Sequence, residues 1–145
     1  MRILAICVNA LILLGCQSMN LHDLPHATST DLVGTWKQVG AARPRTSIAT
    51  FLSDGTYCSY VNQDSERPFS KGSWSIDTGG TLGVQVTQSN DPSDITQPNI
   101  SLLHQTFVMS SSAVLMGPIC PHCQDGIAGT EYRRVALKTT SCGAL

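Results

Sequence analysis

The sequence predicts an all-β domain that is built as a small antiparallel up-and-down barrel of eight strands. Two observations lead to this prediction. Short segments with period-two alternation of apolar and polar residues follow one another from residue 34 to residue 138, with almost no helical pattern. Long and short connections alternate strictly between these segments, and beyond residue 30 every proline falls in a long one, as the hydrogen bonding of a sheet requires.

The individual strands are short and rich in β-branched and aromatic residues. In residues 72–77 the alternation places Trp74 and Ile76 on one face, and residues 81–88 repeat the pattern. Asp54-Gly55 is a strong signal for a tight hairpin. The expected strands cover residues 34–40, 47–53, 56–62, 72–77, 81–88, 102–109, 112–116 and 130–138.

The connections indicate how the strands are joined. Tight turns are expected at 54–55, 78–80 and 110–111, and long loops at 41–46, 63–71, 89–101 and 117–129. Successive connections of a meander lie at opposite ends, so the tight turns share one end, the closed end, and the long loops share the other, the open end. Closing the sheet removes its unpaired edges. The alternative is a two-sheet β-sandwich.

The N-terminus predicts export and a lipid anchor. Residues 1–15 contain Arg2 and then an apolar run, which is the build of a signal peptide. Leu13-Leu14-Gly15-Cys16 resembles the lipobox of bacterial lipoproteins. The resemblance implies cleavage before Cys16, covalent diacylglycerol and N-acyl lipid on that cysteine, and an envelope location; Gln17 favours the outer membrane.

The remaining chain divides into three parts. Residues 16–30 are polar, without periodicity, and are expected to be a flexible tether; residues 31–138 form the barrel, and residues 139–145 form a C-terminal tail. Nine basic residues against ten acidic ones, with no basic cluster, make nucleic acid an unsuitable partner. The expected partners are therefore the membrane, through the lipid, and a small lipophilic ligand or a protein.

Several short motifs resemble small bacterial lipocalin-like domains. They are the opening Gly34-Thr35-Trp36, the hairpin from Phe51 to Asp54-Gly55, and Gly72-Ser73-Trp74. In that family the first Trp fills the closed end of the barrel, and an arginine of the last strand packs across it. The resemblance therefore implies that Arg133 contacts Trp36 at the closed end.

Four cysteines remain in the expected mature chain besides Cys16. Cys58 follows the first tight turn and Cys142 follows the last strand, so both are expected near the closed end, whereas Cys120 and Cys123 lie in the last long loop at the open end. Disulfide-bonded cysteines need Cα atoms within about 7 Å. We therefore predict Cys58–Cys142, which would pin the tail, and Cys120–Cys123.

The motif Cys120-Pro-His122-Cys123 also allows two other interpretations. A redox-active pair relies on a helix N-terminus to lower the thiol pKa, but the residues that follow have a loop composition, so thiol oxidoreductase activity is disfavoured. A metal site would use Cys120, His122 and Cys123 with His104, but ligands so close in sequence would crowd a tetrahedral ion. The structural disulfide is the favoured interpretation.

No catalytic constellation stands out, so we expect a lipid-anchored binding protein and not an enzyme. The favoured function is capture of a small apolar or amphipathic molecule at the open end; the alternative is a protein-binding module, such as a hydrolase inhibitor or an envelope assembly factor. A ligand binder needs an empty apolar cavity of about 300 Å³ or more, whereas an inhibitor needs a filled core and rigid protruding loops. The residues expected to face a ligand are Phe51, Tyr60, Trp74, Val84, Phe107 and Leu115.

Overall fold

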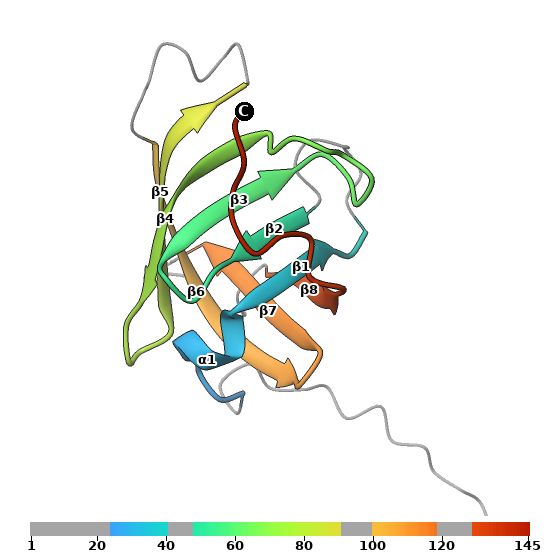
Figure 1. Ribbon diagram of the computed structural model, residues 1–145. Helices are drawn as coiled ribbons and strands as arrows, with labels where there is room; N and C mark the ends of the chain where they lie inside the picture. Colours follow the sequence, from blue (N-terminus) through green and yellow to red (C-terminus); the bar gives the residue numbers. More distant parts are fainter. Residues whose placement is uncertain (1–23, 41–47, 91–99, 119–128) are drawn as a thin grey trace, which may run out of the picture.

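Eight antiparallel strands close into one barrel, in which each strand pairs with its neighbours in sequence and β8 pairs with β1 (Figure 1). The computed structural model describes residues 24–40, 48–90, 100–118 and 129–145. The predicted up-and-down barrel is confirmed, and the two-sheet sandwich is wrong. The elements are α1 (Ser29–Leu32), β1 (Gly34–Gln38), β2 (Ile48–Phe51), β3 (Thr56–Tyr60), β4 (Ser70–Ile76), β5 (Thr81–Ser89), β6 (Ile100–Ser110), β7 (Ala113–Pro118) and β8 (Thr130–Val135).

The tight turns share one end of the barrel, as the sequence predicts. In the β4–β5 turn the Asp77 carboxylate accepts hydrogen bonds from the backbone N–H groups of Gly79 and Thr81, at 2.9 and 2.8 Å. These bonds lower the pKa of Asp77. Gly80 completes the turn with φ of +75°, a backbone conformation that favours glycine. The closed end is thus set by local turn chemistry.

The helix α1 lies across the closed end (Figure 1). The Trp36 indole donates a hydrogen bond of 2.7 Å to the carbonyl of Leu32, the last residue of α1, and both side chains are fully buried. Phe51 and Trp74 pack edge to face beside them, with ring centroids 5.3 Å apart. The closed half of the barrel is therefore a filled core.

No helix in the described part of the chain is long and apolar enough to cross a membrane.

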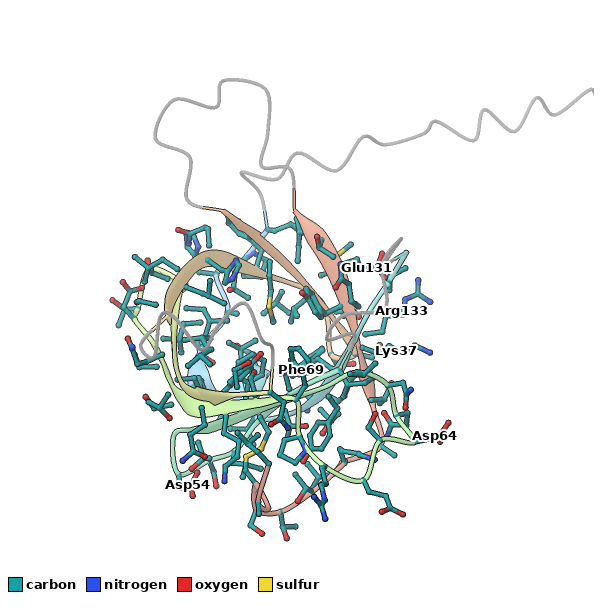
Figure 2. All side chains as sticks on the ribbon, turned by 90° about the horizontal axis from the view of Figure 1, so that it is seen from above. Lys37, Asp54, Asp64, Phe69, Glu131 and Arg133 are labelled. Atoms are coloured by element: carbon teal, nitrogen blue, oxygen red, sulfur yellow. A yellow bond between two sulfur atoms is a disulfide. The ribbon has the colours of Figure 1, made fainter. Side chains whose placement is uncertain are left out.

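Arg134, and not Arg133, packs over Trp36. Its guanidinium carbon lies 4.4 Å from the centroid of the indole, and it donates hydrogen bonds of 2.7 Å to the carbonyls of Asp31 and Val33. Arg133 points away from the barrel, beside Lys37, and pairs with Glu131 at 2.7 Å (Figure 2). The prediction for Arg133 is wrong because it assumed that the inward face continued to Leu137, whereas β8 ends at Val135 and Leu137 is 55% exposed.

Residues 24–28 belong to the folded domain, which corrects the expected tether of residues 16–30. Beyond Gln105, the last residue of β6 that pairs with β5, backbone groups of β6 bind this segment instead. Ala27 N–H donates to the Thr106 carbonyl at 3.0 Å, and Val108 N–H donates to the Pro25 carbonyl at 2.8 Å. The His26 ring stacks on Phe107, with centroids 5.1 Å apart. Paired backbone groups hold this segment on the barrel, and its polar composition did not predict this pairing.

Residues 136–145, which we call the strap, cross the outer face of β1, β2 and β3 (Figure 1). The strap is held by the predicted Cys58–Cys142 disulfide, whose Cα atoms are 6.0 Å apart. Lys138 N–H donates to the Thr35 hydroxyl at 2.9 Å. Because the strap covers this face, Ile48, Cys58 and Tyr60 are buried outside the barrel as a second small core.

Candidate ligand-binding cavity

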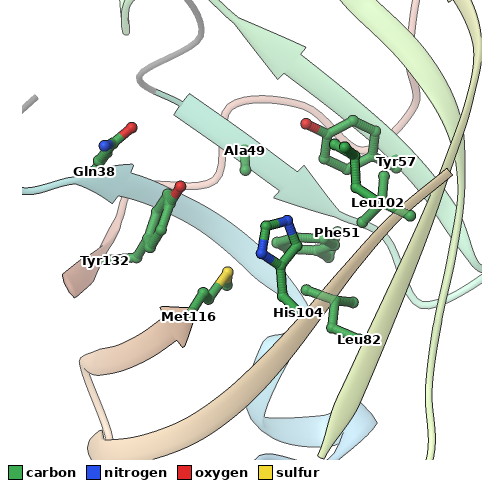
Figure 3. Close-up of a pocket in the computed structure, with 10 residues that line it drawn as sticks. Gln38, Ala49, Phe51, Tyr57, Leu82, Leu102, His104, Met116 and Tyr132 are labelled. Carbon is green, nitrogen blue, oxygen red and sulfur yellow. The ribbon is translucent and has the colours of Figure 1, made fainter. Parts of the chain in front are cut away.

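The half of the barrel away from α1 contains a cavity of about 230 Å³. Several of its residues come from the parts of strands that adjoin the long connections: Gln38 ends β1, Leu102 lies early in β6, and Tyr132 lies early in β8. Others, such as Phe51 and Leu82, lie beside the tight turns, so the cavity reaches from the open end toward the filled core. The lining residues are Gln38, Ala49, Phe51, Tyr57, Leu82, Val84, Leu102, His104, Met116 and Tyr132 (Figure 3).

The register of the strands explains why these side chains point inward. Residues that face one another across antiparallel strands lie on the same side of the sheet. Gln38 pairs with Tyr132, and Leu82 pairs with His104. Phe51 likewise faces Tyr57 across β2 and β3. One inward-facing set thus continues around the barrel from the filled core into the cavity.

The lining is mostly apolar and carries a few polar groups at separate places. Figure 3 shows Met116, from β7, between Tyr132, from β8, and His104, from β6. Gln38 adjoins Tyr132 through the pairing of β1 with β8. Three polar side chains therefore follow one arc of the wall, while Ala49, Phe51, Leu82 and Val84 supply apolar surface elsewhere.

Desolvation keeps the titratable side chains of the cavity uncharged. It lowers the pKa of the half-buried His104 below its ordinary value of 6.5, so the imidazole is neutral at pH 7. Desolvation also raises the pKa of Tyr57 to about 12 and raises the pKa of Tyr132. Among the described residues that line the cavity there is no Asp, Glu, Lys or Arg. The described lining is thus uncharged at neutral pH.

Of the residues expected to face a ligand, three point into the barrel and three lie on its outer face. Phe51 and Val84 line the cavity, and Trp74 lies in the filled core of the closed half. Tyr60 is on the outer face under the strap, because residues 57 and 59 face inward in β3. Phe107 and Leu115, which face each other across β6 and β7, also lie on the outer face, so the prediction for them is wrong.

Thr106 and Met116, the sequence neighbours of Phe107 and Leu115, occupy the inner positions. The sequence does not identify the inner face of β6, because apolar residues occur at both even-numbered and odd-numbered positions of that strand. Sequence reasoning also missed Tyr57, Leu82 and Tyr132 as lining residues. Leu82 had a usable signal, since it alternates with Val84, which was chosen.

The cysteine motif lies outside the described residues, as do Cys16 and its lipidation. Cys120, His122 and Cys123 all fall within 119–128. His104, considered as a fourth metal ligand, lines the cavity instead. Across the part of the chain that the structure describes, no three His, Cys, Asp or Glu side chains are grouped so that they could hold a metal ion.

Comparisons with models of known protein families, with curated proteins and with solved structures find no match to this chain.

Proposed function

We propose that this protein binds a small apolar or amphipathic molecule in the open half of its barrel and that it is not an enzyme. The observation that carries the proposal is a cavity of about 230 Å³ inside a barrel whose other half is tightly filled. A protein that acted only through its outer surface would have no need of an unfilled interior. The apolar lining then supplies affinity and the few polar groups supply orientation.

The size of the cavity limits the ligand. An apolar cavity of about 150 Å³ holds one benzene molecule, and sites for drug-sized ligands begin at about 300 Å³. At about 230 Å³ this cavity is suited to a molecule with one ring or a short acyl chain. The function proposed here is therefore capture of a small molecule and not storage of a long-chain lipid.

We further propose that this binding module is held in the bacterial envelope through lipidated Cys16, most simply at the outer membrane. The support is the Leu13-Leu14-Gly15-Cys16 sequence after a short apolar run. A second support is that the described chain begins beside the closed end, where His26 adjoins the β4–β5 turn at Gly80. An anchor at that end leaves the cavity free to receive ligand.

Calorimetry with toluene and indole as probes tests the binding function. We expect saturable binding at one site with a dissociation constant that is roughly micromolar to millimolar. Ala49→Phe places a ring into the cavity and should abolish binding, whereas Ala113→Phe, on the outward face of β7 opposite Arg133, should bind as the wild type does. A folded wild-type protein that binds neither probe would contradict the proposed function.

A further inference from the structure

Resting on the proposed function, we propose that the ligand is an uncharged single-ring amphiphile with a hydroxyl or similar hydrogen-bonding group, and that His104 is the residue that selects it. Cavity volume alone does not specify the chemistry of the ligand. The placement of the polar groups, the free hydrogen-bonding capacity of His104 and the absence of charge in the described lining support this class of ligand.

The polar groups are arranged so that only some are free to meet a ligand. The Tyr57 hydroxyl is lined by Ser59 and Ser70, which face inward beside it and whose hydroxyls bond each other at 2.6 Å. Within the described part of the chain, the His104 imidazole has no hydrogen-bond partner, although it lines the cavity. His104 is thus an unused recognition group.

A neutral imidazole offers one N–H donor and one nitrogen acceptor. Because His104 is only half-buried, water reaches these groups in the free protein, and a ligand that displaces this water must replace its hydrogen bond. A ligand that does so therefore binds more tightly than one that does not. A hydroxyl can serve either ring nitrogen, because it both donates and accepts. Tyr132, across Met116 on the same arc, is a second polar side chain of the wall (Figure 3).

The surroundings of His104 disfavour charged ligands. Leu82 faces it from β5, Met116 from β7, Tyr132 from β8 and Tyr57 from β3, and none of these is charged at neutral pH. A carboxylate or an ammonium group would lose its hydration here without a counter-charge among the described lining residues. The remaining apolar wall accepts a ring.

The wild-type protein provides the first test, with four probes that share one methyl-substituted ring. Calorimetry at neutral pH compares para-cresol, toluene, para-toluate and para-methylbenzylamine. We expect para-cresol to bind about three- to tenfold more tightly than toluene, which corresponds to one net hydrogen bond, and both charged probes to bind more weakly than toluene. Tighter binding of either charged probe would overturn the assignment of the ligand class.

Substitution of His104 provides the second test. His104→Phe keeps an aromatic ring and removes both nitrogens, so the preference for para-cresol over toluene should disappear while toluene still binds. His104→Gln should restore part of the preference, because its amide can again donate and accept. The matched control is His26→Phe, which removes a histidine from the outer face beside Phe107 and should leave the preference unchanged.

The outcomes separate this inference from the proposed function. Equal binding of para-cresol and toluene to the wild type would overturn the inference while leaving a binding protein. A preference that persists in His104→Phe would remove His104 from the selecting role. Binding of no probe by the folded wild-type protein would overturn both proposals. Nitrogen chemical shifts of the wild-type imidazole give a direct readout, since para-cresol should move the signal of His104 and toluene should not.

Discussion

The guanidinium of Arg134 lies over the indole of Trp36, with its carbon 4.4 Å from the ring centroid, while its N–H groups donate hydrogen bonds to carbonyls at the end of α1. Strands β1 and β8 and the helix thereby meet at one side chain. Arg134→Gln should lower the free energy of unfolding by about 1–2 kcal/mol, from the lost cation–π contact and two charged hydrogen bonds of an exposed side chain. Urea unfolding followed by circular dichroism measures this change.

Arg133→Gln is the matched control for that substitution. It removes the neighbouring arginine, which points outward and pairs with Glu131, and should change the unfolding free energy by no more than about 0.5 kcal/mol. Equal losses for both variants would show that charge, and not the contact with Trp36, accounts for the effect.

Gly34 should be intolerant of a side chain. Its φ is +138°, and an added Cβ would lie 2.5 Å from a guanidinium nitrogen of Arg134. Gly34→Ala should therefore cost about 1–3 kcal/mol, whereas Gly143→Ala, where no atom lies within 4 Å of an added Cβ, should be close to neutral. In an Arg134→Gln background the cost of Gly34→Ala should fall, and a strictly additive double variant would contradict the proposed clash.

The Cys58–Cys142 disulfide should supply a large part of the stability. It joins residues 84 apart, and the loss of chain entropy in the unfolded state then corresponds to about 4 kcal/mol. Cys58→Ala/Cys142→Ala should lower the melting temperature strongly, and Cys142→Ala alone should do nearly as much. If Cys120 and Cys123 form the short second bridge that we predict, Cys120→Ser/Cys123→Ser should have the smaller effect; peptide mapping of the unreduced protein checks both pairings.

Stability should fall when the pH drops below about 6.5, and His104 should be one cause. Its pKa is lowered in the folded state by desolvation, so the unfolded chain takes up a proton first as the pH falls. The stability contributed by the neutral imidazole is complete above the unfolded pKa and is lost as the pH falls through the folded pKa. His104→Phe should flatten this part of the curve; an unchanged slope would show that other groups cause it.

Cys16→Ser should abolish membrane association without unfolding the barrel. Residue 16 precedes the first described residue, Leu24, and the contacts given above that hold residues 24–28 on the barrel are made by other residues. Fractionation of cells that express either form, with acyl labelling of the wild type, measures the change. A Cys16→Ser protein that stays in the membrane fraction would exclude the lipid anchor that we propose.

The topology could be predicted from the sequence because turn residues mark it locally. In both turns the aspartate carboxylate accepts hydrogen bonds from backbone N–H groups of the same turn, and strict alternation of loop lengths then assigns the two ends. The disulfide pairing followed from the same assignment. These signals are local and independent of packing.

The inward faces of the less regular strands could not be predicted, because they depend on register. Tyr57 and Tyr60 are both aromatic in one strand, and the pairing of Phe51 with Tyr57 decides which one enters the cavity. Arg133 and Arg134 are adjacent identical residues, so an error of one position exchanges the one paired with Glu131 for the one over Trp36. Nothing in the sequence of residues 24–28 signals that β6 offers them unpaired backbone groups.

The path of the strap has a consequence for the order of folding. The covalent loop closed by Cys58 and Cys142 contains the end of β3 and all of β4 to β8 but not β1 and β2, which complete the wall beneath the strap. If the thiols were oxidised first, the β1–β2 hairpin would have to slide under a chain that is already tied down. Refolding should therefore be faster when the strands associate before oxidation, and a chain oxidised while unfolded should accumulate an intermediate in which α1, β1 and β2 are still undocked.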